Sequence, residues 1–290
     1  MNTPRISASS YSNTAPLIWS FLYGSNHGKV EIILDNAPAR SAELLSQNRV
    51  DAALVPVIAY QFIDGVKLIP GVCVGARERV RSVCLVTKGA ELAEVRSVSL
   101  DVSSRTSVAL TKIIFREFLG FEPEWRDAKP DIDAMLNESD AALLIGDPAL
   151  SIAECGMRNA DFSEPEVAAT ASTPNSAFRI PHSAFKTFDL AELWRSHTGL
   201  GFVFAMWMTR KDVSPIDFAA ARDEGVEHVE EIISNYQSEI GIGRDEMRRY
   251  LSENISYEPD ESMRDGMELY FKLAAKHGLG GRFAKLIYIS

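Results

Sequence analysis

Tyr11 and Asn13 belong to the first of four segments in which polar side chains directly follow the pattern of a strand. The segment 10–16 reads SYSNTAP, with Thr14 suited to cap a helix and Pro16 suited to its first turn. Polar side chains at such a strand end face the mouth of a sheet, where they can contact a ligand. A plain helix start explains Asn13 equally well when that residue is taken alone.

The segment 77–83, RERVRSV, gathers three arginines immediately before an apolar strand. A guanidinium group can donate two parallel hydrogen bonds to one carboxylate, and the hydroxyl of Ser82 adds a further donor. A solvated loop accounts for Arg77 and Arg79 at least as well. Arg81 and Ser82, which adjoin the strand, are therefore our candidates for contact with an anionic ligand.

The segment 100–110, LDVSSRTSVAL, gives the strongest indication of an anion site. A strand ends there in small hydroxyl residues and one arginine, just before a helix. Unpaired backbone amides and the positive end of the helix dipole point beyond the strand, and the hydroxyls can add hydrogen bonds. Helix capping explains one such hydroxyl but hardly the whole group. The candidates are Ser103, Ser104, Arg105, Thr106 and Ser107.

The segment 142–150, ALLIGDPAL, reads as a buried strand that stops at Gly146 and Asp147, before a helix that begins with Pro148. Gly146 would let a ligand approach the backbone closely because it has no side chain. Asp147 is either part of a site or an ordinary helix cap. The chain contains no P-loop, GxGxxG, GxSxG or Cys/His pair, which argues against nucleotide binding and covalent hydrolysis.

These segments lie in an alternating pattern of strands and helices. The first part of the chain has predicted strands at 5–9, 30–34, 52–56, 67–74 and 82–88, and helices at 16–23 and 39–48. A second unit has predicted strands at 97–101, 124–126 and 141–145, and helices at 104–118 and 132–137. The chain then returns with a strand at 202–209 and helices at 215–237, 244–252 and 259–277. The segment 161–181 is rich in Ala, Ser, Thr and Pro and is expected to form an irregular loop.

This order of units predicts an α/β fold with two lobes. A chain that builds half a lobe, inserts another α/β unit and then returns has the connectivity of a two-domain clamp. We expect residues 1–89 and 204–290 to form lobe I, and residues 90–203 to form lobe II. A ligand would bind in the cleft between the lobes.

The composition limits the partners of the protein. A net charge of −10 and a pI near 5.1 oppose binding to nucleic acid and to anionic membranes. No apolar run reaches the roughly 18 residues of a membrane span. The five histidines lack metal-ligand spacing and the three cysteines form no CxxC pair, so we expect neither a metal site nor a disulfide framework. The N-terminal pattern is a poor secretory signal, which favours a cytoplasmic protein.

Five segments, taken in order, resemble the chorismate dehydratases of the futalosine pathway to menaquinone: SYSNTAP, DAALVPVIAY, RSVCLVTK, LDVSSRTSVAL and ALLIGDPAL. The segment 198–207, TGLGFVFAMW, resembles the same family, and the likeness covers nearly the whole chain apart from 161–181. The resemblance implies a two-lobed fold of the periplasmic-binding-protein type II kind, with the active site in the interlobe cleft. It also implies conversion of a small-molecule substrate, chorismate, to 3-[(1-carboxyvinyl)oxy]benzoate and water, without a cofactor.

The resemblance also implies roles for single residues. Asn13 and Ser82 would be catalytic, next to the reacting carbons, while residues 103–107 and Gly146 would hold a carboxylate. Tyr11, Arg81 and Asp147 complete the expected substrate-binding set. The motif segments contain no histidine or glutamate well placed to act as a general base. We therefore hypothesise that the substrate's own enolpyruvyl carboxylate takes the proton while Asn13 orients it, with Asp147 as the competing base.

Two other functions fit the sequence. One is 1,4-dihydroxy-6-naphthoate synthase, a later enzyme of the same pathway with the same fold and a larger substrate, although the SSRTS pattern favours the dehydratase. The other is a non-catalytic solute-binding protein for a small dicarboxylate, for which two lobes and anion sites would suffice. The sequence leaves the oligomeric state open.

Overall fold

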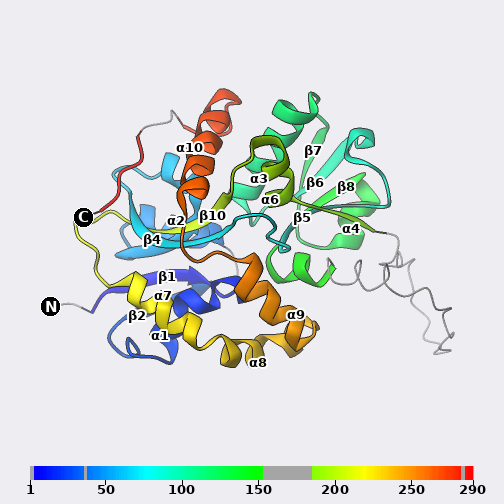
Figure 1. Ribbon diagram of the computed structural model, residues 1–290. Coiled ribbons are helices and arrows are strands. Elements are labelled where there is room, and N and C mark those ends of the chain that lie inside the picture. Colours follow the sequence, from blue (N-terminus) through cyan, green and yellow to red (C-terminus); the bar gives the residue numbers. More distant parts are fainter. Residues whose placement is uncertain (1–2, 36–37, 153–184, 282–284, 290) are drawn as a thin grey trace.

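Two five-stranded sheets, each flanked by helices, make up the computed structural model of the chain (Figure 1). The structure describes residues 3–35, 38–152, 185–281 and 285–289. Figure 1 shows the sheets side by side, with both ends of the chain on the half that holds the first sheet. The α/β class and the two-lobed architecture predicted from the sequence are thereby confirmed.

The first sheet has the strand order β2-β1-β3-β10-β4. Its strands are β1 (Arg5–Ser9), β2 (Glu31–Asp35), β3 (Ala52–Pro56), β4 (Lys67–Ala76) and β10 (Phe202–Thr209). β1 pairs in parallel with β2 and β3, whereas β10 runs antiparallel between β3 and β4. All five residues of β3 are buried, because helices cover both faces of the sheet.

The second sheet repeats this arrangement, with the strand order β7-β6-β8-β5-β9. Its strands are β5 (Val83–Thr87), β6 (Ser97–Asp101), β7 (Glu124–Ala128), β8 (Ala141–Ile145) and β9 (Lys186–Asp189). β6 pairs in parallel with β7 and β8, and β5 runs antiparallel between β8 and β9. The described chain passes between the two sheets at 77–82 and at 199–201.

Helices and short helical turns connect these strands. The α-helices are α1 (Ala15–Leu22), α2 (Pro38–Ser46), α3 (Arg105–Ile113), α4 (Ile132–Glu138), α6 (Leu190–Thr198), α7 (Phe218–Glu227), α8 (Val229–Ile240), α9 (Arg244–Arg249) and α10 (Glu261–Lys276). The 3-10 turns are Ser12–Thr14, Val57–Gln61 and Leu92–Glu94, and the π-helical turns are Ile114–Leu119 and Tyr250–Asn254. Residues 146–152 are also helical.

Most predicted elements are confirmed, two predictions are wrong, and two elements were missed. The single helix expected at 215–237 is two helices, because the backbone leaves helical geometry at His228, with φ −101° and ψ 21°. The helix expected from Pro148 already begins at Gly146. Strand β9 and helix α6 were not predicted at all. The irregular loop expected at 161–181 lies outside the described residues.

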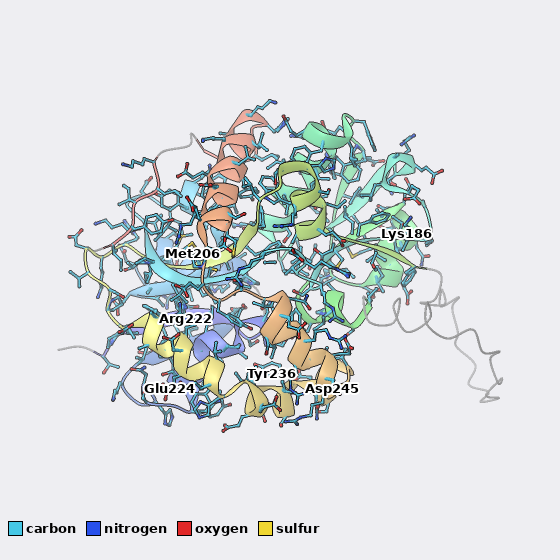
Figure 2. The ribbon with its side chains drawn as sticks, viewed as in Figure 1. Lys186, Met206, Arg222, Glu224, Tyr236 and Asp245 are labelled. Atoms are coloured by element: carbon cyan, nitrogen blue, oxygen red, sulfur yellow. The ribbon has the colours of Figure 1, made fainter. Side chains whose placement is uncertain are left out.

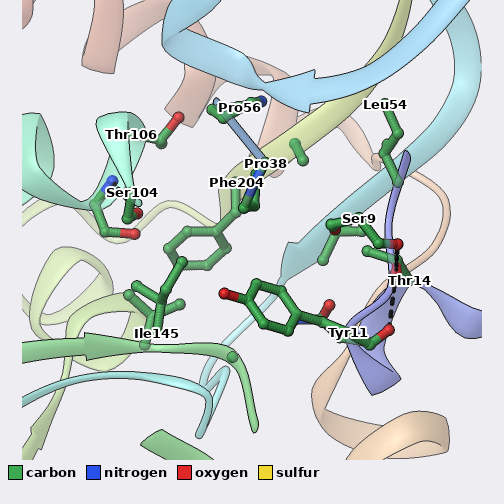
Figure 3. A pocket seen from close by; sticks show the side chains of 16 residues that line it. Ser9, Tyr11, Thr14, Pro38, Leu54, Pro56, Ser104, Thr106, Ile145 and Phe204 are labelled. Atoms are coloured by element: carbon green, nitrogen blue, oxygen red, sulfur yellow. Dashed lines mark hydrogen bonds between the residues drawn. The ribbon is translucent and has the colours of Figure 1, made fainter. Parts of the chain in front are cut away.

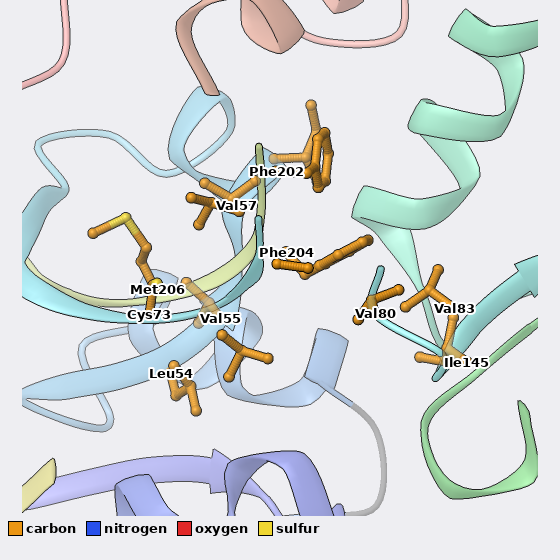
Figure 4. Close-up of a cluster of buried hydrophobic side chains, with 14 of the residues drawn as sticks. Leu54, Val55, Val57, Cys73, Val80, Val83, Ile145, Phe202, Phe204 and Met206 are labelled. Carbon is orange, nitrogen blue, oxygen red and sulfur yellow. The ribbon is translucent and has the colours of Figure 1, made fainter. Parts of the chain in front are cut away.

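One apolar core extends through both halves of the molecule. Figure 4 shows Phe204 of β10 between side chains of the first sheet, such as Val55, and side chains of the second half, such as Val83 and Ile145. Burial of apolar side chains on both sides of this junction stabilises one arrangement of the two sheets. A smaller cluster around Met135 lies within the second half.

Helices α1 and α7 pack on one side of the first sheet, with α10 on the other (Figure 1). Gly225 of α7 permits this contact, since a side chain there would place its Cβ only 1.9 Å from the carbonyl oxygen of Pro16. Arg222, which Figure 2 labels on the same helix, donates a hydrogen bond to the carbonyl oxygen of Gly71 in β4. These contacts hold α7 against both α1 and β4.

Candidate active site

A cavity of about 70 Å³ lies between the two sheets. Residues of the first half that line it include Ser9, Asn13 and Phe204, and residues of the second half include Ser104, Ser107 and Gly146 (Figure 3). The sequence segments 10–16, 100–110 and 142–150 therefore meet in one cleft. Their convergence follows from topology, because the carboxyl ends of the parallel strands β1 and β3 face those of β6 and β8.

The beginning of α3 forms one wall of the cleft. Ser104 is the N-cap residue, and its hydroxyl accepts a hydrogen bond from the backbone N–H of Ser107 at 3.3 Å. Ser104, Thr106 and Ser107 are all buried and line the cavity. The Thr106 hydroxyl accepts from the backbone N–H of Ile58 at 3.3 Å, which ties α3 to the first half. A helix start with neighbouring hydroxyls is suited to binding a carboxylate.

Tyr11 covers the cleft from the first half. Its ring lies over Gly146, where an added Cβ would be 3.1 Å from three ring atoms, and Gly146 has a φ of +66°. Burial raises the pKa of the Tyr11 phenol, opposed by a hydrogen bond with the Ser103 side chain. Ser103 in turn donates from its hydroxyl to the carboxylate of Asp101 at 2.6 Å. Tyr11 is therefore neutral at physiological pH and connects the two halves through Ser103.

Asp147 also connects the halves, outside the small cavity. Its carboxylate accepts hydrogen bonds from the hydroxyl of Ser12 and from the Ser12 backbone N–H, the latter at 3.3 Å. Burial raises the pKa of Asp147, and the bonds from Ser12 oppose that effect. The carboxylate faces a second, larger hollow of about 720 Å³ that lies on the other side of Tyr11 and is also lined by Trp19 and Tyr236.

Asn13 and Ser82 are both buried, and they differ in their relation to the cavity. Asn13 lines the cavity and is only 8% exposed. Ser82 is fully buried and lies just behind the wall, next to Val83, which does line the cavity. Its backbone carbonyl accepts from the N–H of Gly146 at 2.7 Å, and its hydroxyl donates to the carbonyl of Val80 at 3.4 Å. Of the two expected catalytic residues, Asn13 therefore lines the cavity, whereas Ser82 does not.

The arginines are engaged by protein groups rather than placed in the cavity. Arg81 is buried with a φ of 61°, and its guanidinium donates to Glu246 at 3.1 Å and to Asn254 at 3.4 Å. Arg105 is exposed, and it lines a different hollow beside Phe62. Arg77 and Arg79 form ion pairs with Asp260 and Glu192 at the surface. The cleft wall therefore offers a ligand neutral donors.

The charge of the cleft wall matters for its chemistry. Among the described residues, none that lines the cavity carries a carboxylate, an imidazole or a positive charge. The described parts of the chain also contain no group of three His, Cys, Asp or Glu side chains that could hold a metal ion. No helix within the described ranges is long and apolar enough to span a bilayer. A reaction at this site would therefore need a proton acceptor that is not one of the described residues of the cavity wall.

Tyr250 is a residue of the site that sequence reasoning missed. It is fully buried at the start of the π-helical turn Tyr250–Asn254, and the side chains of Ser82 and Asn13 lie close enough to lower its pKa. Burial has the larger, opposite effect and raises that pKa well above its usual range. Nothing in the local sequence distinguished this tyrosine from an ordinary helical core residue.

The chain has clear relatives among known proteins. A sequence model of the menaquinone biosynthesis family matches residues 4–276. The chorismate dehydratase of Thermus thermophilus is 30% identical to it over 262 residues, which are 88% of this chain and 89% of that protein.

Solved structures show the fold. A protein from Archaeoglobus fulgidus, 17% identical, superposes with a TM-score of 0.64 and covers 95% of this chain and 98% of its own. The periplasmic aliphatic sulphonate binding protein SsuA of Escherichia coli, 15% identical, has a TM-score of 0.59 and covers 99% of this chain and 93% of its own. The predicted periplasmic-binding-protein-like fold is confirmed. Because the family match spans nearly all of its length, the chain belongs to the menaquinone biosynthesis family.

Proposed function

We propose that this chain is a chorismate dehydratase, which converts chorismate to 3-[(1-carboxyvinyl)oxy]benzoate and water in the futalosine pathway to menaquinone. The relative from Thermus thermophilus and the family support the proposal. The observation that carries it is the cleft, in which the α3 start meets Asn13 across a cavity that no charged side chain of the described residues lines.

The substrate has two carboxylates, and the cleft offers two kinds of donor for them. The first is the α3 start, where backbone amides and the hydroxyls of Ser104 and Ser107 can hold one carboxylate. The second is the side-chain amide of Asn13, which can donate to the enolpyruvyl carboxylate from the opposite half. Neutral donors in a buried site bind an anion without a counter-charge that would have to be desolvated as well.

The reaction needs little chemistry from the protein. Loss of the ring proton beside the enolpyruvyl ether and of the neighbouring hydroxyl group, as water, turns the diene into an aromatic ring. We propose that the enolpyruvyl carboxylate of the substrate takes the proton while Asn13 orients it, and that Ser82 or a water molecule assists departure of the hydroxyl. The absence of a carboxylate or imidazole on the described cavity wall favours this route over one through Asp147.

Binding requires the cleft to open. A volume of about 70 Å³ holds roughly two water molecules, which is less than a six-membered ring with two carboxylates requires. The side chain that closes the cavity is Tyr11, which separates it from the larger hollow. Substrate therefore enters when the halves separate or Tyr11 turns away, and closure then excludes water from the reacting carbons.

We also place the reaction in the cytoplasm. Cys73 and Cys84, the cysteines of the described residues, are both buried free thiols. Burial raises the pKa of each thiol well above its usual value, so both stay protonated and unreactive. Unpaired thiols of this kind suit a reducing compartment.

The proposal is tested by incubating the purified protein with chorismate and a metal chelator and following the products by mass spectrometry. We expect a product lighter than chorismate by one water molecule, and its formation should fall at least 100-fold in Asn13→Ala. Binding of chorismate without any product would instead indicate a solute-binding protein. No binding of chorismate would leave 1,4-dihydroxy-6-naphthoate synthase as the better candidate.

A further inference from the structure

Phe204 lies at an irregularity of strand β10. Val203 is opposite Gly75 of β4, and Ala205 is opposite the very next residue of that strand, Val74. Phe204 is therefore an extra residue of β10 at this point, and the pairing of β10 with β3 begins only after it, at Ala205. Such a bulge interrupts the hydrogen bonds of a sheet, bends the strand and changes the direction in which a side chain points. The ring of Phe204 is thus directed by the bulge rather than by the regular alternation of a strand.

That ring lines the small cavity between the two halves. Figure 3 shows it on the side of the cavity between Ser104 and Tyr11. Among the described residues that line the cavity, Phe204 and Tyr11 alone carry an aromatic ring. Tyr11 separates the cavity from the larger hollow, so it has space into which it can turn when a ligand enters.

Phe204 has no such space. It is only 7% exposed, and its ring lies 4.7 Å from the ring of Phe202 at an angle of 60°. Figure 4 shows it enclosed between side chains such as Val55 and Val83, which belong to the same apolar core. A side chain in a close-packed core keeps its rotamer, because another one would overlap its neighbours. Phe204 is therefore a fixed wall, and it limits how large a ring system the cleft can hold.

On the basis of the proposed function, we infer that Phe204 is a specificity-determining residue, which admits a carboxylate ligand with one six-membered ring and excludes a ligand with two fused rings. The flat, apolar face of phenylalanine suits the ring of such a ligand, while the donors at Asn13 and Ser104 suit its carboxylates. A second fused ring would need the space that the Phe204 side chain occupies, and that side chain has no room to withdraw.

The test compares the affinities of two probe ligands in Phe204→Ala and in the wild type. The probes are isophthalate, a dicarboxylate with one ring, and naphthalene-2,7-dicarboxylate, a dicarboxylate with two fused rings. Isothermal titration calorimetry measures both dissociation constants. We expect the wild type to bind the one-ring probe roughly tenfold more tightly than the two-ring probe. In Phe204→Ala this preference should fall or reverse by roughly tenfold or more, because the larger probe gains the vacated space.

Phe202→Ala is the matched control. Phe202 lies on the same strand and is 1% exposed, yet it is not among the described residues that line the cavity. Both variants lose a buried ring, so both should melt at a lower temperature than the wild type. In Phe202→Ala the preference should stay within about threefold of the wild-type value. The ratio of two affinities measured on one protein does not depend on the fraction that is folded, so a loss of stability does not imitate the expected result.

A second variant, Phe204→Leu, removes less volume and should change the preference in the same direction even if Phe204→Ala does not fold. An unchanged preference in the Phe204 variants, an equal change in Phe202→Ala, or a wild type that shows no preference or binds neither probe would overturn the inference. The proposed function is judged separately, by turnover of chorismate in the wild type. Turnover with an unchanged preference in the variants would keep the proposed function and refute the inference, whereas a changed preference in a protein without turnover would do the reverse.

Discussion

Gly146 shows how a single backbone position can control the cleft. Its φ of +66° is unfavourable for any other residue, and a methyl group there would meet the ring of Tyr11 at 3.1 Å. We expect Gly146→Ala to cost about 1 kcal/mol of stability through the backbone and to lower kcat/KM for chorismate roughly tenfold or more by displacing Tyr11.

Gly28→Ala separates these two effects. Gly28 has a φ of +74°, and no atom lies within 4 Å of an added Cβ. An alanine there therefore strains the backbone without contacting any other side chain. Urea denaturation should show similar losses of stability in the two variants, while steady-state kinetics should show a loss only in Gly146→Ala. Equal kinetics in both variants would mean that Tyr11 and Gly146 do not shape the site.

Asp147 should make stability depend on pH in a defined direction. Burial raises its pKa above the ordinary value of 3.8, so the folded protein binds the proton more tightly than the unfolded chain. Its contribution is fully present below about pH 3.8 and is lost as the pH rises through the raised pKa of the folded state. The free energy of unfolding of the wild type relative to Asp147→Asn should therefore fall as the pH rises from 4 toward neutrality.

Asp212→Asn provides the opposite case. Asp212 is exposed, and its pKa is lowered by Lys67, so its contribution is lost as the pH falls instead. Urea denaturation between pH 4.5 and 7.5 should give a slope for Asp147→Asn and almost none for Asp212→Asn, because the lowered pKa confines the effect of Asp212 to pH values below about 3.8. The same Asp147→Asn protein also tests the mechanism: a loss of several orders of magnitude in turnover, with chorismate binding intact, would make Asp147 the base.

For single residues, the sequence indicated site residues that follow strand ends more reliably than residues whose role depends on partners far away in the chain. Asn13, Ser104 and Gly146 line the cavity because the fold brings the ends of parallel strands together, which the strand pattern reveals. Arg81 could not be judged in the same way, because its partner Glu246 lies 165 positions away. Tyr250 could not be identified from the sequence for the same reason, since its position near Asn13 depends on where α9 packs.

The contact between α1 and α7 offers a test at the scale of elements. Alanine is favoured over glycine inside a helix by about 1 kcal/mol, yet a Cβ at Gly225 would overlap the carbonyl of Pro16. We expect Gly225→Ala to be destabilising by about 1–3 kcal/mol, because the helices must move apart. Val226→Ala, at an exposed position of the same helix, should change the free energy of unfolding by less than about 0.5 kcal/mol. A stabilised Gly225→Ala protein would show that propensity outweighs the contact.

Elements with a strong hydrophobic pattern were predictable, and elements without one were not. β3 and β8 read directly as strands, since every residue of both is apolar and buried. β9 reads KTFD, with one large apolar residue, and it is held in place at the sheet edge by pairing with β5. The break at His228 could not be predicted, because α7 and α8 both have a helical sequence pattern and only one residue separates them.

Besides the shared apolar core, two polar contacts close the cleft between the halves. The hydroxyl and N–H of Ser12 donate to Asp147, and Tyr11 interacts with Ser103. Ser12→Ala removes one of these bonds, worth about 1 kcal/mol, which corresponds to roughly a fivefold change in the ratio of closed to open molecules. X-ray scattering should show a larger average radius of gyration for the variant than for the wild type, and chorismate should abolish the difference. Identical radii without ligand would mean that Ser12 does not hold the halves together.

We retain as a proposal the division into lobe I, residues 1–89 and 204–290, and lobe II, residues 90–203. The strands group differently at both boundaries. β5 (Val83–Thr87) belongs to the second sheet and β10, which starts at Phe202, belongs to the first, so boundaries just before residue 83 and just before Phe202 suit the structure better. The pairing of β5 with β8 and β9 of the second sheet could not be read from the sequence, because a crossing strand looks the same whichever sheet it joins.

The antiparallel pairing of β5 with β9 has a consequence for protein engineering. Cys84 is the partner of Asp189 in this pair, so the stretch of chain that builds the second sheet starts and finishes at the same place. A gene fragment encoding that stretch would yield one uninterrupted polypeptide, whereas the remainder would need only a short artificial loop to rejoin its two pieces. Foreign binding modules with adjacent ends could be grafted at this junction in the same manner.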